Sequence, residues 1–368
     1  MNKAKVKPAK KAKHDKPAQP ESAVKPEQLV KPSRDTLALV ESPAQLLNVI
    51  EWAHHAHSEA TTRIAVLPPR DTAGRVQLAS MAALAKADGL AVSWYEPRSS
   101  AAALVQVAWE LFPRLAKATR LVIGDPFSRF VQAILPLADV DRVVVVDDGT
   151  ATISFVNQLV RGEQLVRWHL PEGGRDVVRE VFADQARRYF VPAPSQGRSV
   201  DLFTAMPVAA PEGVGLAIND FAWTKRRFGP PEVTDTVDLI GTSLVETGVI
   251  ALDPYLQGVA ALTAEHGAGR YFAHRRESDD KLRRIAKKTG LSVVRPDVPL
   301  EVAVRRGPVS RLIVSFPSTI THTVPLVLAG TGVTLAICDV PTSWMTASAP
   351  GGAAEFLAGV TASARDRH

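Results

Sequence analysis

The sequence predicts an α/β protein built around two parallel sheets, and three observations carry this prediction. Strand-length apolar runs such as Val143–Val146 alternate with amphipathic segments of helix length from residue 36 onward. This alternation is interrupted once, by a proline- and glycine-rich stretch at 190–233, and then resumes. The chain of 368 residues is also too long for one ordinary core. Repeated strand–helix alternation indicates βαβ units with right-handed crossovers.

Residues 35–206 are expected to form the first Rossmann-like domain. Its first helix should begin at Pro43, because Ser42 is a good N-cap and proline suits the first helical turn. The expected strands are 36–40, 63–67, 91–95, 121–123, 141–146 and 200–206, and further helices lie near 73–88, 100–117, 127–138, 153–160 and 176–189.

Residues 234–345 are expected to form a second Rossmann-like domain, joined to the first by a linker at 207–233. The basic-aromatic segment 221–228 should pack at the hinge or line the cleft, and stacking against nucleic acid bases is the alternative. A C-terminal helix within 346–368 is expected to fold back over the connection. The expected strands are 236–240, 270–273, 291–295, 311–315 and 333–338, with helices at 253–265 and 279–289, from 299, and from 317 to 328.

The composition is that of a soluble globular protein, with 46% hydrophobic and 22% charged residues. No apolar run approaches the roughly 18 residues that a transmembrane helix needs. The N-terminus lacks the apolar segment of a secretory signal. The single cysteine, Cys338, excludes an intramolecular disulfide and a cysteine-based zinc site. We therefore expect a cytoplasmic protein.

The net charge of +6 comes from the N-terminal segment, residues 1–34. This segment contains nine lysines and Arg34 against three acidic residues, which leaves about −1 for the rest of the chain. It lacks aromatic residues and apolar periodicity, so we expect a disordered tail. Such a tail could contact anionic lipid at the inner face of the plasma membrane, or nucleic acid, through screened attraction. A solubilising extension is the alternative, and nucleic acid is not the expected partner because the body carries no excess positive charge.

Two adjacent carboxylates, Asp147 and Asp148, follow the valine-rich strand, and Gly149 permits a sharp turn after them. Ligands of open α/β sheets bind at this carboxyl edge. Because two close carboxylates repel each other, one of them could have a raised pKa and serve as a general base. A solvated pair of acids, or an acid that caps the next helix, is the alternative.

Two groups of polar residues follow strands in the second half. Gly241 and Thr242 could present backbone amides and a hydroxyl to an anion, although the glycine could equally serve a turn. His274 and Arg275 suit a phosphate leaving group, since arginine neutralises charge and histidine can donate a proton. A solvated basic turn is the alternative for this second pair.

Two further groups lie at helix starts. Glu301 could accept hydrogen bonds from both hydroxyls of a ribose, or merely complement the helix dipole. Ser318 and Thr319 could bind an anion with the unpaired amides at a helix N-terminus, or one of them could be an ordinary N-cap. Together the four groups predict a nucleotide-phosphate pocket without a P-loop or a G-x-G-x-x-G fingerprint. The histidines at 54, 55 and 57 have no accompanying acidic cluster, so no metal site is expected.

Taken together, these residues resemble the bacterial sialyltransferases and polysialyltransferases that use CMP-sialic acid, especially the lipooligosaccharide sialyltransferase and capsule polysialyltransferase groups. The resemblance covers about residues 36–340. It rests on Ser42-Pro43-Ala44-Gln45, Asp147-Asp148-Gly149-Thr150, His274 after a strand, and Ser318-Thr319 at a helix start. The family usually has His-Pro where this chain has His274-Arg275, which should alter the rigidity of that loop.

The resemblance implies a GT-B fold, with the acceptor on the N-terminal domain and the CMP-sugar on the C-terminal domain across a cleft. It implies an inverting, metal-independent transfer of a sialic acid-like sugar to a glycan hydroxyl of a cell-surface polysaccharide or glycolipid, with no cofactor besides the donor substrate. Asp148, or Asp147, would deprotonate the acceptor, and His274 would protonate or hydrogen-bond the departing phosphate. Ser318 and Thr319 would bind the phosphate oxygens, and Glu301 would hold the ribose.

Two other functions remain open at this point. The chain could be a GT-B transferase that uses CMP-Kdo or a UDP- or GDP-sugar. It could also be a noncatalytic binding protein that kept the fold and uses its basic tail to reach a membrane or nucleic acid.

Overall fold

The computed structural model describes residues 35–166 and 177–365 together with Met1. The predicted disordered tail, residues 1–34, lies outside the described part of the chain except for Met1. Within that part no helix is both long and apolar enough to cross a bilayer.

The first sheet has seven strands, all paired in parallel, in the order β3-β2-β1-β4-β5-β6-β7. The order reverses between β1 and β4, which makes the carboxyl edge there the expected ligand position of a doubly wound sheet. The strands are β1 (Thr36–Val40), β2 (Thr62–Val66), β3 (Ala91–Trp94), β4 (Arg120–Ile123), β5 (Arg142–Val146), β6 (Ser199–Thr204) and β7 (Gly215–Ile218). Their helices are α1 (Pro43–His55), α2 (Thr72–Ala87), α3 (Ala101–Leu115), α4 (Arg129–Ile134), α5 (Ala151–Arg161), α6 (Val177–Tyr189) and α7 (Ala222–Phe228).

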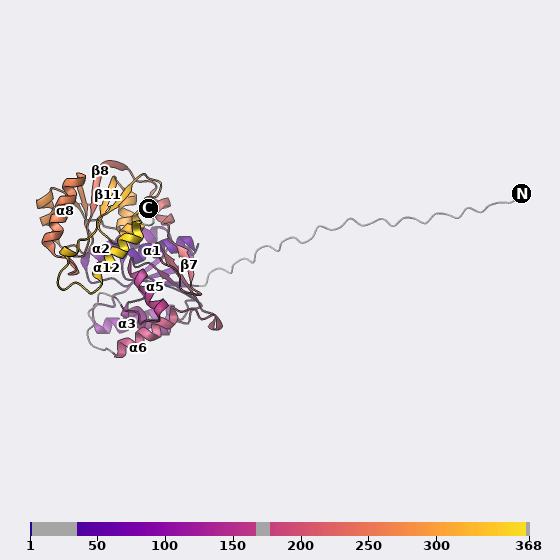
Figure 1. Ribbon diagram of the computed structural model, residues 1–368. Coiled ribbons are helices and arrows are strands. Elements are labelled where there is room, and N and C mark those ends of the chain that lie inside the picture. Colours follow the sequence, from indigo (N-terminus) through magenta and orange to yellow (C-terminus); the bar gives the residue numbers. More distant parts are fainter. Residues whose placement is uncertain (2–34, 167–176, 366–368) are drawn as a thin grey trace. The chain divides into compact units, whose positions relative to one another are not determined.

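The second sheet has five parallel strands in the order β10-β9-β8-β11-β12, and its order reverses between β8 and β11. Figure 1 shows this sheet in colours from coral (β8) to orange (β11), with α8 beside it. The strands are β8 (Val233–Ile240), β9 (Arg270–Phe272), β10 (Ser292–Val294), β11 (Val309–Ser315) and β12 (Thr334–Ile337). The helices are α8 (Leu252–His266), α9 (Asp279–Thr289), α10 (Leu300–Arg306), α11 (Ile320–Val327) and α12 (Ala353–Arg365). The predicted α/β class with two parallel sheets is thus confirmed.

The valines of β5 explain why this strand lies in the interior of the sheet, covered on both faces. Val144 and Val146 pack into the apolar cluster on one face of the sheet, and Val143 and Val145 pack into the cluster on the other. Because side chains alternate between the two faces of a strand, an unbroken run of valines fits only a strand covered on both sides. The first cluster continues to residues of the second sheet, including Ile313, so one apolar core extends to both sheets.

The predicted linker at 207–233 differs from the structure, because it contains β7 and α7 and β7 extends the first sheet. Phe221 and Trp223 are buried in the core, which confirms packing for this segment and leaves those rings unable to stack on bases. Glu51 of α1 accepts hydrogen bonds from the backbone amides of Trp223 and Thr224, both at 2.9 Å, and thereby holds the start of α7. The prolines and glycines of this stretch predict a linker, and for that reason the two short elements β7 and α7 were not predicted.

The C-terminal helix is present as α12, but its neighbours differ from the expectation. It contacts α11, and Ala353 and Leu357 pack into the core of the second sheet. Ser363 Oγ also lies 3.5 Å from His322 Nε2 of α11. The helix therefore covers the second sheet, because its apolar face matches that core.

Candidate active site

Asp147 lies at the end of β5 and is buried, with 2% of its surface exposed. One carboxylate oxygen accepts a hydrogen bond from the Thr204 hydroxyl, and the other accepts one from the Ala205 amide at 2.6 Å. Burial is the main cause that raises the pKa of Asp147 to about 6. Both oxygens are engaged by β6 and the loop after it, so the geometry corrects the expectation that Asp147 could serve as the base: it fixes the end of β5.

This burial gives the stability of the protein a measurable pH dependence. A carboxyl group whose folded pKa exceeds its unfolded pKa stabilises the fold at low pH, and that contribution is lost as the pH rises through the folded pKa. For Asp147 the window runs from its ordinary value of 3.8 to about 6. We expect the unfolding free energy of the wild type, relative to Asp147→Asn, to fall by on the order of 3 kcal/mol between pH 4 and pH 7. Urea unfolding of both proteins across this range measures it, and a constant difference would contradict the assignment.

Asp148 is half-buried, and its carboxylate contacts α1 instead of the end of β6. Its Oδ1 accepts a hydrogen bond of 2.9 Å from Gln45 Nε2. Gln45 belongs to the first turn of α1, and its own Oε1 accepts from the Glu41 amide at 2.7 Å. Gly124, after β4, makes room for this side chain, since a Cβ there would come within 2.7 Å of Gln45 Cβ. The Ser42-Pro43-Ala44-Gln45 segment therefore orients the carboxylate of Asp148.

A second carboxylate, Glu41, lies nearby at the end of β1. It forms an ion pair with Arg98, and its Oε1 accepts from the Ser128 hydroxyl at 2.6 Å. Burial raises the pKa of Glu41, and the negative charge of Asp148 raises it further. Sequence reasoning missed this residue, although its position directly after the first strand was the available signal. Glu41 and Asp148 thus place two acids at the carboxyl edge of the sheet, after the two strands that flank β4.

The turn after Asp148 contacts the second sheet. The Thr150 amide donates a hydrogen bond of 3.0 Å to Thr319 Oγ1, which follows β11. Gly149 has a φ of +67°, and a Cβ there would overlap the same hydroxyl. Glycine is therefore required twice, by the backbone conformation and by the close approach of Thr319. Two of the motifs predicted from sequence, one from each half, meet at this contact.

Ser318 and Thr319 precede α11, but neither side chain caps that helix. The Thr319 hydroxyl is turned toward Thr150 instead, and the Ser318 carbonyl accepts from the Thr321 amide at 3.2 Å. The alternative of an ordinary N-cap is therefore wrong, and the first turn of α11 has no side-chain acceptor of its own. An anion at this helix start would meet backbone amides and the positive end of the helix dipole.

Glu301 lies in the first turn of α10 and is 6% exposed. Its Oε1 accepts a hydrogen bond of 2.7 Å from the Thr323 hydroxyl of α11, one turn beyond Thr319. Burial raises the pKa of Glu301. The residue therefore stands beside the same helix as the predicted phosphate site, and its role toward a ribose stays a prediction.

Gly241 and Thr242 have structural partners. The Gly241 amide donates to the Phe272 carbonyl at 2.8 Å, and the Thr242 hydroxyl accepts from the Leu244 amide at 3.3 Å. A Cβ on Gly241 would overlap the side chains of Glu277 and Tyr271. The Gly241 amide is thus already engaged, which corrects its expected role toward an anion: the glycine is there for close packing.

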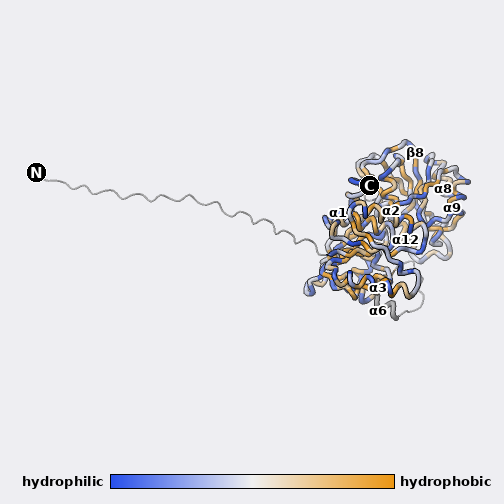
Figure 2. The backbone as a smooth tube through the Cα atoms, turned by 180° about the vertical axis from the view of Figure 1, so that it is seen from behind, coloured by the Kyte–Doolittle hydropathy of each residue, from blue (hydrophilic) through white to orange (hydrophobic). Residues whose placement is uncertain are grey.

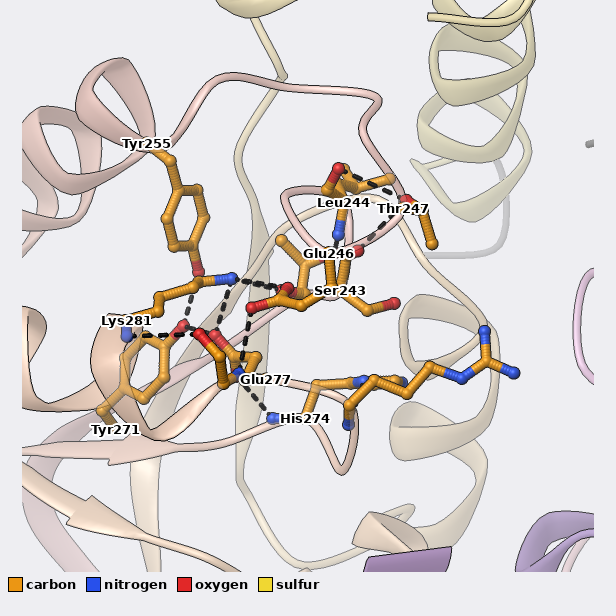
Figure 3. Close-up of polar contacts among 12 residues, drawn as sticks. Ser243, Leu244, Glu246, Thr247, Tyr255, Tyr271, His274, Glu277 and Lys281 are labelled. Atoms are coloured by element: carbon orange, nitrogen blue, oxygen red, sulfur yellow. Dashed lines mark hydrogen bonds and ion pairs between the residues drawn. The ribbon is translucent and has the colours of Figure 1, made fainter. Parts of the chain in front are cut away.

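A buried ion pair explains that packing. Lys281 of α9 is 1% exposed, and its Nζ lies 2.9 Å from Glu277 Oε1 and 3.2 Å from Glu246 Oε2. The same Nζ donates to the Thr242 carbonyl at 2.7 Å, and the Tyr271 hydroxyl donates to Glu277 at 2.6 Å. Figure 3 shows Lys281 between the loops that follow β8 and β9. We call Glu246, Tyr271, Glu277 and Lys281 the buried ionic cluster; Glu246 is its one solvent-exposed member, at the edge.

The buried ionic cluster also sets the position of His274. The His274 amide donates to Glu277 Oε2 at 2.6 Å, and its Nδ1 accepts from the Arg276 amide at 3.2 Å (Figure 3). Burial, and then the charges of Arg275, Arg276 and Lys281, lower the pKa of His274 to about 3. A neutral ring that accepts at Nδ1 carries its proton on Nε2. Without a bound anion, His274 is therefore a hydrogen-bond donor through Nε2, rather than a cationic acid.

The strand order relates these residues. His274 follows β9 and Thr319 follows β11, and both strands flank β8. Adjacent strands are about 4.8 Å apart, so the two loops leave the same edge about 10 Å from each other. At that separation, side chains from the two loops can reach one phosphate group from opposite sides. Arg275 is half-buried in the same loop as His274.

Over residues 35–166 and 177–365, no group of three or more histidine, cysteine or acidic side chains is placed to hold a metal ion.

Comparisons with known proteins find no matching family model and no similar curated sequence. Among solved structures, an α/β-galactoside α-2,3-sialyltransferase from Photobacterium phosphoreum is 10% identical with a TM-score of 0.49, and the match covers 91% of this chain and 96% of that one. The E. coli heptosyltransferase WaaC with ADP-2-deoxy-2-fluoro heptose is 12% identical (TM-score 0.42; 88% and 99% covered). LpCGTa in complex with UDP is 14% identical (TM-score 0.48; 91% and 93% covered). These are likenesses of fold and identify no family for this chain.

Proposed function

We propose that this protein is a GT-B glycosyltransferase that moves a sialic acid-like sugar from a CMP donor to a hydroxyl of a cell-surface glycan. The observation that carries the proposal is the contact between Thr150 and Thr319. It brings the turn after the acid pair of the first sheet to the predicted phosphate-binding helix start of the second sheet. A base and a phosphate site at one place are what sugar transfer from a nucleotide donor requires.

In the proposed reaction Asp148 takes the proton of the acceptor hydroxyl. The acceptor oxygen attacks the anomeric carbon from the face opposite the phosphate, and the bond from that carbon to the phosphate oxygen breaks. Gln45 holds Asp148 by its hydrogen bond of 2.9 Å, so the carboxylate is oriented before the acceptor arrives. The sugar is transferred with inversion, and CMP leaves.

Negative charge develops on the departing phosphate and is stabilised by hydrogen-bond donors. The amides at the start of α11, with Ser318 and Thr319, supply them at one side, and His274 Nε2–H supplies another. Glu301 accepts from the ribose hydroxyls. The phosphate diester of the bound donor carries one negative charge and gains a second as its bond to the sugar breaks. Both charges raise the pKa of the His274 ring, which allows proton transfer to the leaving oxygen as that bond breaks.

The identity of the nucleobase in the donor is tested by thermal unfolding of the protein with CMP, UMP, GMP and AMP. Binding to the native state raises the unfolding midpoint according to affinity and concentration. We expect CMP to raise it most. Stronger stabilisation by another nucleotide would reassign the donor while keeping the reaction class, and equal small shifts for all four would contradict a nucleotide site.

The hydroxyl of Thr319 is tested by Thr319→Val, which keeps the shape of the side chain. This change removes the hydroxyl that accepts from the Thr150 amide and that is proposed to donate a hydrogen bond to the phosphate. We expect it to raise the KM for the CMP-sugar by about 10- to 100-fold. Thr289→Val is the matched control, because Thr289 bonds only within α9 and its loop. Unchanged donor kinetics in Thr319→Val would remove this residue from the site.

A further inference from the structure

Three polar side chains of α1 are buried, although the rest of this helix packs in an apolar core. Gln45, Asn48 and Glu51 follow one another at intervals of three residues and are 2%, 7% and 2% exposed. The helix lies beside α2 in both views (Figures 1 and 2). Gln45 contacts the carboxylate of Asp148, and Glu51 holds the start of α7. Asn48 lies between them, and the proposed reaction has not yet given it a role.

Asn48 is hydrogen-bonded on both sides of its amide. Its Nδ2 donates a bond of 3.0 Å to the Asp147 carbonyl, and its Oδ1 accepts one of 2.9 Å from Asn219 Nδ2. Asn219 follows β7 and is 1% exposed, and its own Oδ1 accepts from the Phe221 amide at 3.0 Å. Three hydrogen bonds therefore lead from the start of α7 to the turn that carries Asp148.

The direction of each of these bonds is fixed by the two ends of the chain of bonds. The Phe221 amide can only donate, and the Asp147 carbonyl can only accept. Both asparagine side chains must therefore turn their oxygen toward α7 and their nitrogen toward Asp147. Reversal of either would bring two donors or two acceptors together in a buried place, which is costly. The two asparagines thus have one arrangement, and they can hold the turn in one position.

The peptide group that joins Asp147 to Asp148 is held at both of its polar atoms. Asn48 donates to its carbonyl oxygen, and its N–H donates to Thr152 Oγ1 at 3.3 Å. Gln45 contacts the Asp148 carboxylate separately, at 2.9 Å. The backbone before Asp148 and its side chain are therefore fixed by different residues, and rotation of this peptide group would carry the carboxylate away from Gln45.

The other end of the chain of bonds lies where the two sheets are connected. Phe221 has a φ of +59°, a left-handed conformation that is rare for a bulky residue and costs energy. The bond from its amide to Asn219 stabilises this conformation. The helix α7 begins at the next residue and contacts α1 of the first sheet and α10 of the second. The two asparagines therefore join the turn of Asp148 to the segment through which the chain enters the second sheet.

We propose that Asn48 and Asn219 are positioning residues for the sugar transfer, and that they hold Asp148 where it takes the proton of the acceptor hydroxyl. They act through Asp148, so this inference rests on its proposed role as the base. Their effect falls on the transfer step, because a displacement of about 1 Å in a reacting group can slow a reaction by about 100-fold. The proposed phosphate and ribose contacts lie on the other sheet and should keep their geometry.

The test uses Asn48→Leu and Asn219→Leu, which nearly keep the size of the side chain and remove its hydrogen bonds. We expect Asn48→Leu to lower kcat by about 10- to 100-fold. Asn219→Leu removes bonds one step farther from the turn, and we expect a decrease of about 3- to 10-fold. The double change should cost no more than Asn48→Leu alone, because both changes break one chain of bonds. CMP affinity should stay within about twofold of the wild type in all three proteins.

Hydrogen exchange of segment 147–152, followed by mass spectrometry, reports on the turn without the reaction. We expect this exchange to be at least about tenfold faster in Asn48→Leu than in the wild type. Thr62→Val is the matched control, because it removes a buried hydroxyl that donates to the Ser58 carbonyl at 2.8 Å, at the opposite end of the same sheet. It should change neither kcat nor the exchange of this segment. Thermal midpoints of all variants check the fold.

A fall in kcat at constant CMP affinity, together with faster exchange of the turn, would support the proposal. Wild-type kcat in Asn48→Leu would overturn it, and so would a parallel loss of kcat and CMP affinity, which indicates a general loss of structure. If Asn48→Leu does not fold, the same outcomes in Asn219→Leu decide. A wild-type protein that transfers no sugar would contradict the proposed function, and the exchange rates then decide separately whether the two asparagines hold the turn.

Discussion

Replacement of Asp148 by asparagine is expected to lower kcat for sugar transfer by about 10²- to 10⁴-fold, which is the usual contribution of a general base. The amide has nearly the shape of the carboxylate, and its oxygen can still accept from Gln45 Nε2, so the turn should keep its structure. CMP affinity should stay within about twofold of the wild type, because the proposed phosphate and ribose contacts come from the other sheet. Initial rates of transfer and isothermal titration with CMP measure the two quantities.

The control for this change is Asp141→Asn, which alters an exposed acid at the other end of β5. It should retain both activity and CMP affinity. Equal loss of transfer and CMP binding in Asp148→Asn would indicate a structural role for Asp148. Retention of full activity would assign the base to another residue, with Glu41 the nearest candidate on the same edge.

The change Lys281→Met is expected to lower the unfolding free energy by about 3–5 kcal/mol, the usual effect of removing one partner from a buried ion pair. It leaves the carboxylate of Glu277 buried without its cation. Because burial already raises the pKa of Glu277, the effect should be smaller at pH 5, where the lone carboxyl can take up a proton, than at pH 8. Urea unfolding at both pH values measures this.

Two further variants separate charge from packing at this position. Arg283→Met removes an exposed cation from the same helix and should cost little, since its ion pair with Asp280 is solvated. The double change Lys281→Met with Glu277→Gln should recover part of the lost stability, because no unpaired charge remains. A small effect of Lys281→Met, or no recovery in the double variant, would show that the buried ionic cluster does not hold the loops after β8 and β9.

Elements with a strong pattern could be predicted from the sequence. The four valines of β5 fit only a strand covered on both faces, and Asp147 and Asp148 necessarily follow it. The two sheets could be predicted because strand-length apolar runs alternate with helix-length amphipathic segments in both halves of the chain. The strand β7 was missed because it is short, half-exposed and surrounded by prolines and glycines, so neither its hydrophobicity nor its periodicity exceeds that of a loop.

The contacts that set side-chain roles could not be predicted, because they join residues that are distant in sequence. Lys281 follows two aspartates in a highly charged helix, and such a lysine is normally solvated. Only the fold brings it to Thr242 and Glu246, about 40 residues earlier. The different roles of Asp147 and Asp148 likewise depend on distant residues. Thr204 contacts Asp147, and Gln45 contacts Asp148.

The central claim is that Asp148 of the first sheet and the phosphate-binding groups of the second sheet face a single site, where the donor and the acceptor react. A crystal structure with CMP bound tests it most directly. We expect the CMP phosphate within about 3 Å of Thr319 or Ser318 and of His274 Nε2, with the open side of the phosphate toward Asp148. CMP bound elsewhere, or a phosphate from which Asp148 is screened by protein, would contradict the claim.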